Sequence, residues 1–292
     1  MNALAQQILG GLTTGLVYAL LALGFSAVYQ SMRLINFAQG DLFMAGSFIG
    51  YLLATKLHLS FLPVLALTLV ICFALGVTVE RLALAPRSAN ASQVNLMIRT
   101  IGVSVFLQGA ALLLFGTEEY RFPDLLSGEP ILVGGLVVPR SLEIVGAASL
   151  GLMLLLWAFL KNTRTGTAMR AASQDRAGAE MIGIDVARMR SLAYGISAAL
   201  AGGGGVLIGP LWYVHQSMGV MMGLKGFTAA VIGGLGSMPG AIVGGICLGV
   251  IENLSTGYLS STWKDAIVFA ILLAMLSLRP DGIFRTRSAE RA

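Results

Sequence analysis

The stretch Ile8–Tyr29, ILGGLTTGLVYALLALGFSAVY, contains no charged residue and is long enough to cross a lipid bilayer as a single helix. A hydrocarbon core about 30 Å thick needs about 20 apolar helical residues. The residues before this stretch carry neither the basic segment nor the small-residue cleavage site of a signal peptide. We therefore interpret it as a retained first membrane helix.

Similar apolar segments recur along the whole chain, which is 56% hydrophobic and only 11% charged. An average soluble domain has about 25% charged residues. With the first stretch, the apolar segments number nine, at about residues 8–29, 40–55, 61–79, 97–116, 141–160, 192–209, 219–234, 240–255 and 262–279. We predict an all-α, polytopic transmembrane bundle of about 8–9 spans, with residues 1–292 forming one domain.

Basic residues indicate the orientation of these spans, because Lys and Arg concentrate in cytoplasmic loops. An N-outside orientation puts thirteen of them inside, namely Arg33, Arg81, Arg87, Lys161, Arg164, Arg170, Arg176, Arg188, Arg190, Arg279, Arg285, Arg287 and Arg291. Five fall outside, namely Lys56, Arg121, Arg140, Lys225 and Lys264, and Arg99 lies at the inner end of the fourth span. We predict an N-outside, C-inside topology. The net charge of +5 reflects this bias, so we expect no nucleic-acid partner.

Residues 219–255 are the least regular part of the predicted bundle. The runs GVMMGLKGFTAAVIGGLG and GSMPGAIVGGICLGVIEN are short and are interrupted by glycines and Pro239. Broken helices at membrane depth occur where the backbone lines a cavity or is buried in protein. We therefore expect re-entrant or discontinuous helices here.

Two loops are long enough to carry function. The outer loop, residues 117–140, contains ILVGGLVV, which predicts a hairpin with a Gly-Gly turn. It offers either a docking surface for an extracytoplasmic partner or a structural cap over the bundle.

The inner loop, residues 161–191, is rich in alanine, glycine and arginine. Its composition predicts a helix over 171–182 that ends at Gly183, followed by a second amphipathic piece beginning at Ile184 and Asp185. A solvated, positively charged loop is the alternative. We favour a structured segment on which a cytoplasmic partner can pack.

The sequence lacks the motifs of common active sites. It has no G-x-x-x-x-G-K-[ST] phosphate loop, no H-E-x-x-H, no G-x-S-x-G and no cysteine pair at metal-binding spacing. We expect no enzymatic activity and no cofactor. Glu252 is an acid well inside an apolar segment, and Asp41, Glu80 and Lys225 lie near predicted helix ends. A structural role for Glu252 is favoured over ion coupling, because proton and sodium relays normally need more intramembrane acids than this.

The stretch LINFAQGDLFMAG, residues 34–46, places Asn36, Gln39 and Asp41 between two apolar runs. Arg33 marks the inner side, so these side chains fall at the cytoplasmic start of the second span. There the helix dipole favours Asp41 in the first turn. We favour a role in setting the start of this helix, with direct contact to a solute as the alternative.

Three long stretches resemble the inner-membrane permeases of branched-chain amino-acid ABC transporters. They are GLTTGLVYALLALGFSAVYQSMRLINFAQGDLFMAG at 11–46, RAASQDRAGAEMIGIDVARMRSLAYGISAALAGGGGVL at 170–207 and KGFTAAVIGGLGSMPGAIVGGICLGVIEN at 225–253. They occur in family order, and the chain length is similar to that of the shorter of the two paired permeases. Gln39 stands where the family commonly has His, and 202–205 is an unbroken glycine run where alternating Ala-Gly is usual.

The resemblance implies a bacterial inner-membrane importer with a second homologous permease, two cytoplasmic ATPases and an extracytoplasmic amino-acid-binding protein. Within it, residues 161–191 would be the cytoplasmic coupling loop, whose candidate residues are Ala172, Asp175, Arg176, Glu180, Gly183 and Asp185. The candidates for the translocation pathway are Asn36, Gln39, Asp41, Lys225, Thr228 and Glu252. The expected substrate is a branched-chain or other hydrophobic amino acid. A related permease for urea or short amides, or an ion-coupled secondary transporter, are the alternatives.

Overall fold

The computed structural model describes residues 2–85, 92–126, 128–133, 136–258 and 261–284. Each predicted apolar segment lies on a helix. These long helices are α1 (Asn2–Met32), α2 (Gln39–Lys56), α3 (Phe61–Val79), α4 (Gln93–Phe115), α5 (Arg140–Asn162), α8 (Val186–Ile208), α9 (Met218–Gly233), α10 (Met238–Tyr258) and α11 (Lys264–Leu278). A π-helical turn, η1 (Glu80–Leu84), continues α3.

The predicted helical membrane bundle is confirmed. In the described residues six helices, α1, α3 with η1, α4, α5, α8 and α10, are long and apolar enough to cross a bilayer. Helix α9 is a shorter apolar helix of 16 residues. The number of full spans and their orientation remain predictions.

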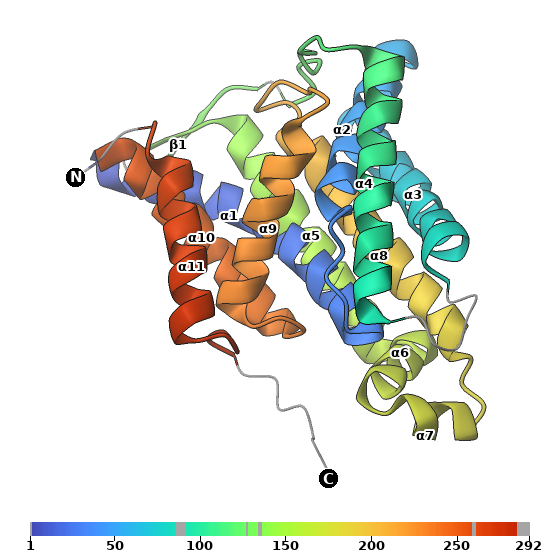
Figure 1. Cartoon of the computed structure of the whole chain (residues 1–292). Coiled ribbons are helices and arrows are strands. Elements are labelled where there is room, and N and C mark those ends of the chain that lie inside the picture. The colour runs from blue at the N-terminus through green and yellow to red at the C-terminus, as the bar shows by residue number, and fades with distance from the viewer. Residues whose placement is uncertain (1, 86–91, 127, 134–135, 259–260, 285–292) are drawn as a thin grey trace.

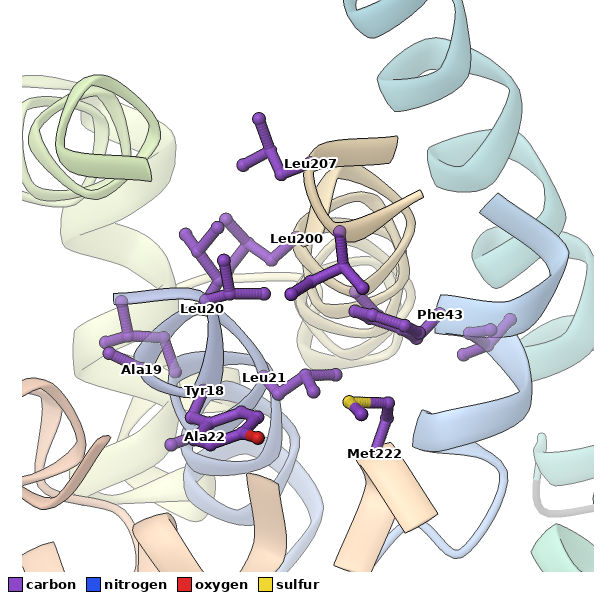
Figure 2. Packing of buried hydrophobic residues seen from close by; sticks show 14 of the residues in the cluster. Tyr18, Ala19, Leu20, Leu21, Ala22, Phe43, Leu200, Leu207 and Met222 are labelled. Atoms are coloured by element: carbon purple, nitrogen blue, oxygen red, sulfur yellow. The ribbon is translucent and has the colours of Figure 1, made fainter. Parts of the chain in front are cut away.

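Helices α1 and α8 form the centre of the bundle. Both are largely buried, and α1 packs against α10, α8, α9 and α5 (Figure 1). Figure 2 shows Leu20 and Leu21 of α1, Leu200 of α8 and Phe43 of α2 gathered around the same interior space. Helices α3, α4 and α5 bury less than a third of the residues in their apolar spans. The periphery is therefore built to face lipid or other subunits.

Glycine allows α1 and α10 to pack with their backbones in close contact. A Cβ atom added at Gly15 would come within 2.8 Å of the Ile246 Cα atom, and one at Gly249 within 2.3 Å of the Gly15 Cα atom. In lipid, such small-residue contacts replace the hydrophobic driving force that holds soluble helices together. The high glycine content is thus used at this interface.

The chain breaks between α9 and α10, whereas the discontinuous helices predicted for this region are not observed. Helix α9 ends at Gly233, Gly234 has a φ of +103°, and Pro239 lies in the first turn of α10. Proline is tolerated there because the first N–H groups of a helix have no intrahelical partner. Each of the two helices is itself continuous, and whether they cross the membrane fully remains a prediction.

The predicted outer hairpin is also confirmed. Strands β1 (Ile131–Val133) and β2 (Leu136–Val138) pair antiparallel, with Ile131 opposite Val138. The Gly-Gly turn at 134–135 lies outside the described residues, as do Arg87, Arg285, Arg287 and Arg291 of the orientation argument.

The inner segment differs from the prediction of one helix over 171–182. It forms two helices, α6 (Arg164–Gln174) and α7 (Arg176–Met181), at the opposite end of the molecule from β1 (Figure 1). Asp175 has extended backbone angles, and its side chain accepts a hydrogen bond from the Gly178 N–H. Aspartate competes with the helical backbone for hydrogen bonds and favours the N-cap position. It therefore ends α6 and starts α7.

Candidate functional site

The polar residues of LINFAQGDLFMAG lie in a buried network of uncharged groups, here called the amide network (Asn36, Gln39, Tyr194 and Ser197). The Asn36 Oδ1 atom accepts a hydrogen bond from the Tyr194 hydroxyl at 2.9 Å, and the Asn36 amide donates to Gln39 Oε1 at 3.2 Å. The Ser197 hydroxyl lies 2.8 Å from both Gln39 Oε1 and the Gly24 carbonyl oxygen. The network therefore links α1, the start of α2 and the middle of α8.

Asn36 also shapes the start of α2, because its Oδ1 atom accepts a hydrogen bond from the Ala38 N–H at 3.1 Å. Asp41 lies in the first turn of α2, as predicted, but its carboxylate makes no cap. Its Oδ1 atom instead accepts a hydrogen bond of 2.9 Å from the Gln108 amide, which also donates to Ser104. Asp41 thus connects α2 to α4, one of the exposed peripheral helices.

A second cluster, here called the charged cluster, joins four helices through Lys225, Glu252, Asp265 and Tyr18. The Lys225 Nζ atom donates to Glu252 Oε1 at 2.6 Å, and the Tyr18 hydroxyl donates to Glu252 Oε2 at 2.8 Å. The Lys225 ammonium also lies 2.9 Å from Asp265 Oδ1, an ion-pair distance without hydrogen-bond geometry. Lys225 is predicted as an outer basic residue; its side chain is buried and paired, and the side of the membrane on which it lies remains a prediction.

The predicted pathway candidates divide between these groups. Asn36 and Gln39 share the amide network, Lys225 and Glu252 share the charged cluster, and Asp41 pairs with Gln108. Thr228 donates to the Leu224 carbonyl of its own helix. All six candidates are buried. In this conformation all of them except Thr228 hold helices together.

A third buried group fixes the inner end of α3 to α8. The Glu80 carboxylate of η1 accepts from the Arg190 Nε atom at 2.6 Å and from the Ser191 hydroxyl. The Glu80 side chain is almost fully buried, and that of Arg190 is 11% exposed. Arg190 is predicted as a cation of the inner loop. Instead it lies within α8 and forms a buried ion pair.

The predicted coupling residues lie together on the exposed inner segment. Asp175 caps α7, and Asp185 caps α8 by accepting from the Arg188 N–H at 2.9 Å. Arg176 and Glu180 form an exposed ion pair at 3.3 Å. Gly183 has a φ of +83°, a conformation that favours glycine, so its predicted role in ending a helix is confirmed. Ala172 lies on α6 and is half-buried.

The tip of this segment carries apolar side chains that the sequence analysis does not single out. Met181 is 87% exposed and Ile182 is 75% exposed, directly before Gly183. Among the described residues 161–191, these two are the exposed large hydrophobic side chains. Exposed apolar side chains outside a membrane span mark contacts with partners. A Met-Ile pair preceding a predicted helix-ending glycine is the signal that would have identified them.

Other functional-site residues are missed because their partners are far apart in sequence. Tyr194 and Ser197 lie on α8 and look like ordinary helix residues, and Gln108 lies in the otherwise apolar second half of α4, residues 105–115. Asp265 lies in the first turn of α11, where an acidic residue is expected from the helix dipole alone. Only the packing of the helices brings these groups to Asn36, Gln39, Asp41 and Lys225.

Comparison with known proteins extends these observations to the whole chain. Residues 7–276 match the family model described as branched-chain amino acid transport system / permease component. The permease protein LivH of a high-affinity branched-chain amino acid transport system in Salmonella typhimurium is 36% identical, over 98% of this chain and 97% of the relative. BraD, the corresponding permease protein of Pseudomonas aeruginosa, is 34% identical over the same shares of the two chains.

A solved structure shows the same fold at much lower sequence identity. It is an inward-facing conformation of a metal-chelate type ABC transporter, 16% identical to this chain, with a TM-score of 0.53 over 94% of this chain and 87% of the other. The family match and the relatives cover nearly all of the chain, including the buried clusters and the inner segment. The chain therefore belongs to the family of permease components of branched-chain amino acid transport systems.

Proposed function

We propose that this chain is the membrane-spanning subunit of a bacterial ATP-binding-cassette importer and forms half of a translocation pathway for branched-chain or other hydrophobic amino acids. The observation that carries the proposal is the similarity to LivH and BraD over 98% of the chain. The resemblance of its three long sequence stretches to this family supports it. The chain itself catalyses no reaction and holds no cofactor.

The partners follow from the family and from the shape of this subunit. A second, homologous permease completes the pathway, two cytoplasmic ATPases supply energy, and an extracytoplasmic binding protein delivers the amino acid. All work at the inner membrane, with residues 117–140 outside and residues 161–191 inside. The α6–α7 segment projects from one end of the bundle, which supports its assignment to the ATPase side (Figure 1).

We assign coupling to Ala172, Asp175, Arg176, Glu180, Gly183 and Asp185, with Met181 and Ile182 as the apolar contact. The two caps and the ion pair give the segment a fixed shape. Met181 and Ile182 would enter a groove of the ATPase, so closure of the ATPases would move α6 and α7. The motion would pass from α7 to α8 and then to α3, because Arg190 near the start of α8 pairs with Glu80 at the end of α3.

The pathway residues hold one packing of the helices in this conformation, and these contacts would break when the helices move to another conformation. Asp41 and Gln108 link the core helix α2 to α4, and Lys225 and Asp265 link α9 to α11. Because α4 and α11 have few other neighbours within the chain, movement of either helix would expose Asp41 or Lys225. An amino acid has an ammonium and a carboxylate, and these charges would be met by those two side chains.

Transport by the complete complex in proteoliposomes tests the proposed function. The vesicles contain this chain, its permease partner and the ATPases, with ATP at the ATPase side and the binding protein with radiolabelled leucine at the other. We expect leucine to accumulate against its gradient only with both ATP and the binding protein.

Two outcomes would contradict the proposal. Uptake that persists without ATP and collapses with the ion gradient would indicate a secondary transporter. Equilibration without accumulation would indicate a channel. Competition by unlabelled isoleucine and valine, compared with urea and acetamide, decides the substrate class.

A further inference from the structure

A large groove opens at the end of the bundle that carries α6. Its volume is about 990 Å³, at the upper end of the roughly 300–1,000 Å³ typical of ligand pockets. Its walls come from the last turns of α1 and α5 and the first turn of α10, and α6 closes one end. None of the residues proposed for the translocation pathway lines it.

The wall formed by α5 changes from apolar to cationic along its length. Met153, Leu156, Trp157, Leu160 and Lys161 all line the groove. Their spacing of three and four residues places them on one face of the helix. The eight steps from Met153 to Lys161 span about 12 Å at 1.5 Å of rise per residue. Met153, Leu156 and Leu160 are buried, so Trp157 is the apolar side chain of this wall that is open to an acyl chain, one helical turn from the cation Lys161.

The polar end of the groove is positively charged. Lys161, Arg170 and Arg33 line the groove. All of its lining residues lie in the described chain, and none of them is acidic. Within the described residues, neither Lys161 nor Arg170 makes an ion pair. Lys161 lies 4.6 Å from the centre of the Trp157 ring, and Arg170 donates a long hydrogen bond to Thr167. Both are exposed and available to an anion.

The start of α10 adds to this charge. Gly236, Ser237, Met238 and Pro239 line the groove beside the cations. The N-terminus of a helix of 21 residues carries a partial positive charge that favours an anion. Trp157 is 56% exposed, and tryptophan concentrates where the bilayer meets water. The groove therefore combines a cationic end, an apolar wall and an interfacial aromatic residue.

We propose that this groove binds an anionic phospholipid of the inner leaflet, with the phosphate at Lys161 and Arg170 and an acyl chain along the exposed Trp157 and the partly exposed Met238 and Ile242. Basic pockets between membrane helices on the cytoplasmic side are suited to anionic headgroups. A zwitterionic lipid fits less well, because the lining has no carboxylate for its amine. A soluble phosphate would leave the exposed Trp157 uncovered. The inner leaflet follows from the proposed orientation.

Native mass spectrometry of the assembled transporter in detergent tests the proposal. The complex is titrated with phosphatidylglycerol, with phosphatidylcholine of the same acyl chains and with glycerol phosphate as a headgroup without chains. We expect phosphatidylglycerol to bind at least about tenfold more tightly than either of the others. In detergent, lipid binding does not depend on the membrane orientation of the complex. A failure to bind phosphatidylglycerol would therefore leave the proposed transport function standing.

Substitutions locate the binding. Replacing both Lys161 and Arg170 with Gln should lower phosphatidylglycerol affinity about thirtyfold, equivalent to about 2 kcal/mol. The matched control replaces Arg81 and Arg188 with Gln, which removes two exposed cations of the same end outside the groove, and should change affinity less than twofold. Ser173→Glu, which adds an anion beside the cations, should also weaken binding and serves if the double variant fails to assemble.

Three results would overturn the proposal. The first is an equal loss of affinity in the control, and the second is equal binding of phosphatidylcholine or glycerol phosphate. The third is binding to the permease pair that disappears when the ATPases assemble, because the groove would then be part of the ATPase interface.

Discussion

The amide network and the charged cluster both hold membrane helices together, but they differ in the groups they bury. The amide network uses uncharged side chains whose hydrogen bonds are all made between neighbours in α1, α2 and α8. The charged cluster buries the Lys225 ammonium and the Glu252 carboxylate between α9 and α10, with the partly exposed Asp265 of α11 beside the ammonium and Tyr18 of α1 bonded to Glu252. One region is electrically neutral, and the other depends on a balance of charge.

The difference matters because an unpaired charge costs far more in lipid than an unpaired amide. A neutral group that loses its partner can find a substitute in the membrane, and interhelical hydrogen bonds there average about 0.6 kcal/mol. A buried ion that loses its partner typically costs about 3–5 kcal/mol. We therefore expect the charged cluster to tolerate change poorly and the amide network to tolerate it better.

Lys225→Ala should have the largest effect on stability. It leaves Glu252 and Asp265 without the cation that lies between them. We expect a loss of about 3–5 kcal/mol in the free energy of unfolding of the purified permease, measured by titration with SDS.

A double variant separates charge balance from packing in this prediction. Lys225→Met combined with Glu252→Gln removes the two most buried charges and keeps an acceptor for the Tyr18 hydroxyl, while the remaining Asp265 carboxylate is 32% exposed to water. It should lose less than half as much stability as Lys225→Ala. An equal or greater loss would show that side-chain packing, and not charge, dominates the cluster.

Glu80→Ala should have the next largest effect. It leaves the Arg190 guanidinium without its partner, but that side chain is 11% exposed and lies near the end of the bundle, where water can reach it. We expect a loss of about 2–3 kcal/mol, which is typical of a hydrogen bond to a charged group. Glu80→Gln, which keeps the shape and one acceptor, serves as the control and should lose less. Equal losses in the two variants would contradict an ionic role.

Ser197→Ala measures the amide network. The change removes the hydroxyl that lies between Gln39 and the Gly24 carbonyl, and it adds no bulk. We expect a loss of about 0.5–1.5 kcal/mol by the same SDS titration. Ala199→Ser, at a partly exposed position of the same helix, is the control and should change the stability less. A loss comparable to that of Lys225→Ala would erase the distinction between the two regions.

Arg176→Ala should have the smallest effect on stability. Its ion pair with Glu180 is exposed on both sides, and such pairs contribute about 0–1 kcal/mol. We expect less than about 0.5 kcal/mol of change in unfolding, and a clear reduction in ATP-driven uptake if Arg176 contacts the ATPase. A large loss of stability would mean that the inner segment folds against the bundle more tightly than its exposure indicates.

The helices of the fold could be predicted from the sequence almost completely. Long apolar runs such as Ile8–Tyr29 require helices, since lipid offers the backbone no other hydrogen-bond partner. The hairpin at 131–138, the break before Pro239 and the helix end at Gly183 were also visible, because each has its own local residue signal.

The pairing of polar groups could not be predicted in the same way. The sequence indicates that Lys225 and Glu252 are unusual, but whether they meet depends on the relative rotation and depth of α9 and α10. Asp175 shows a local limit of the same kind. Its neighbours favour a helix, and only the competition between backbone and side chain for the Gly178 N–H decides where that helix breaks.

The central claim, that ATP hydrolysis elsewhere drives this chain through its α6–α7 segment, is tested most directly by Met181→Ser with Ile182→Ser. The measurement is leucine accumulated per ATP hydrolysed in proteoliposomes containing the complete complex. Leu82→Ser, at another exposed apolar residue near the same end, is the matched control. We predict that the double variant lowers ATP-driven accumulation at least about tenfold, because two apolar contacts of about 1.5–3 kcal/mol each are lost, while the control retains it. Wild-type accumulation per ATP in the double variant would contradict the account.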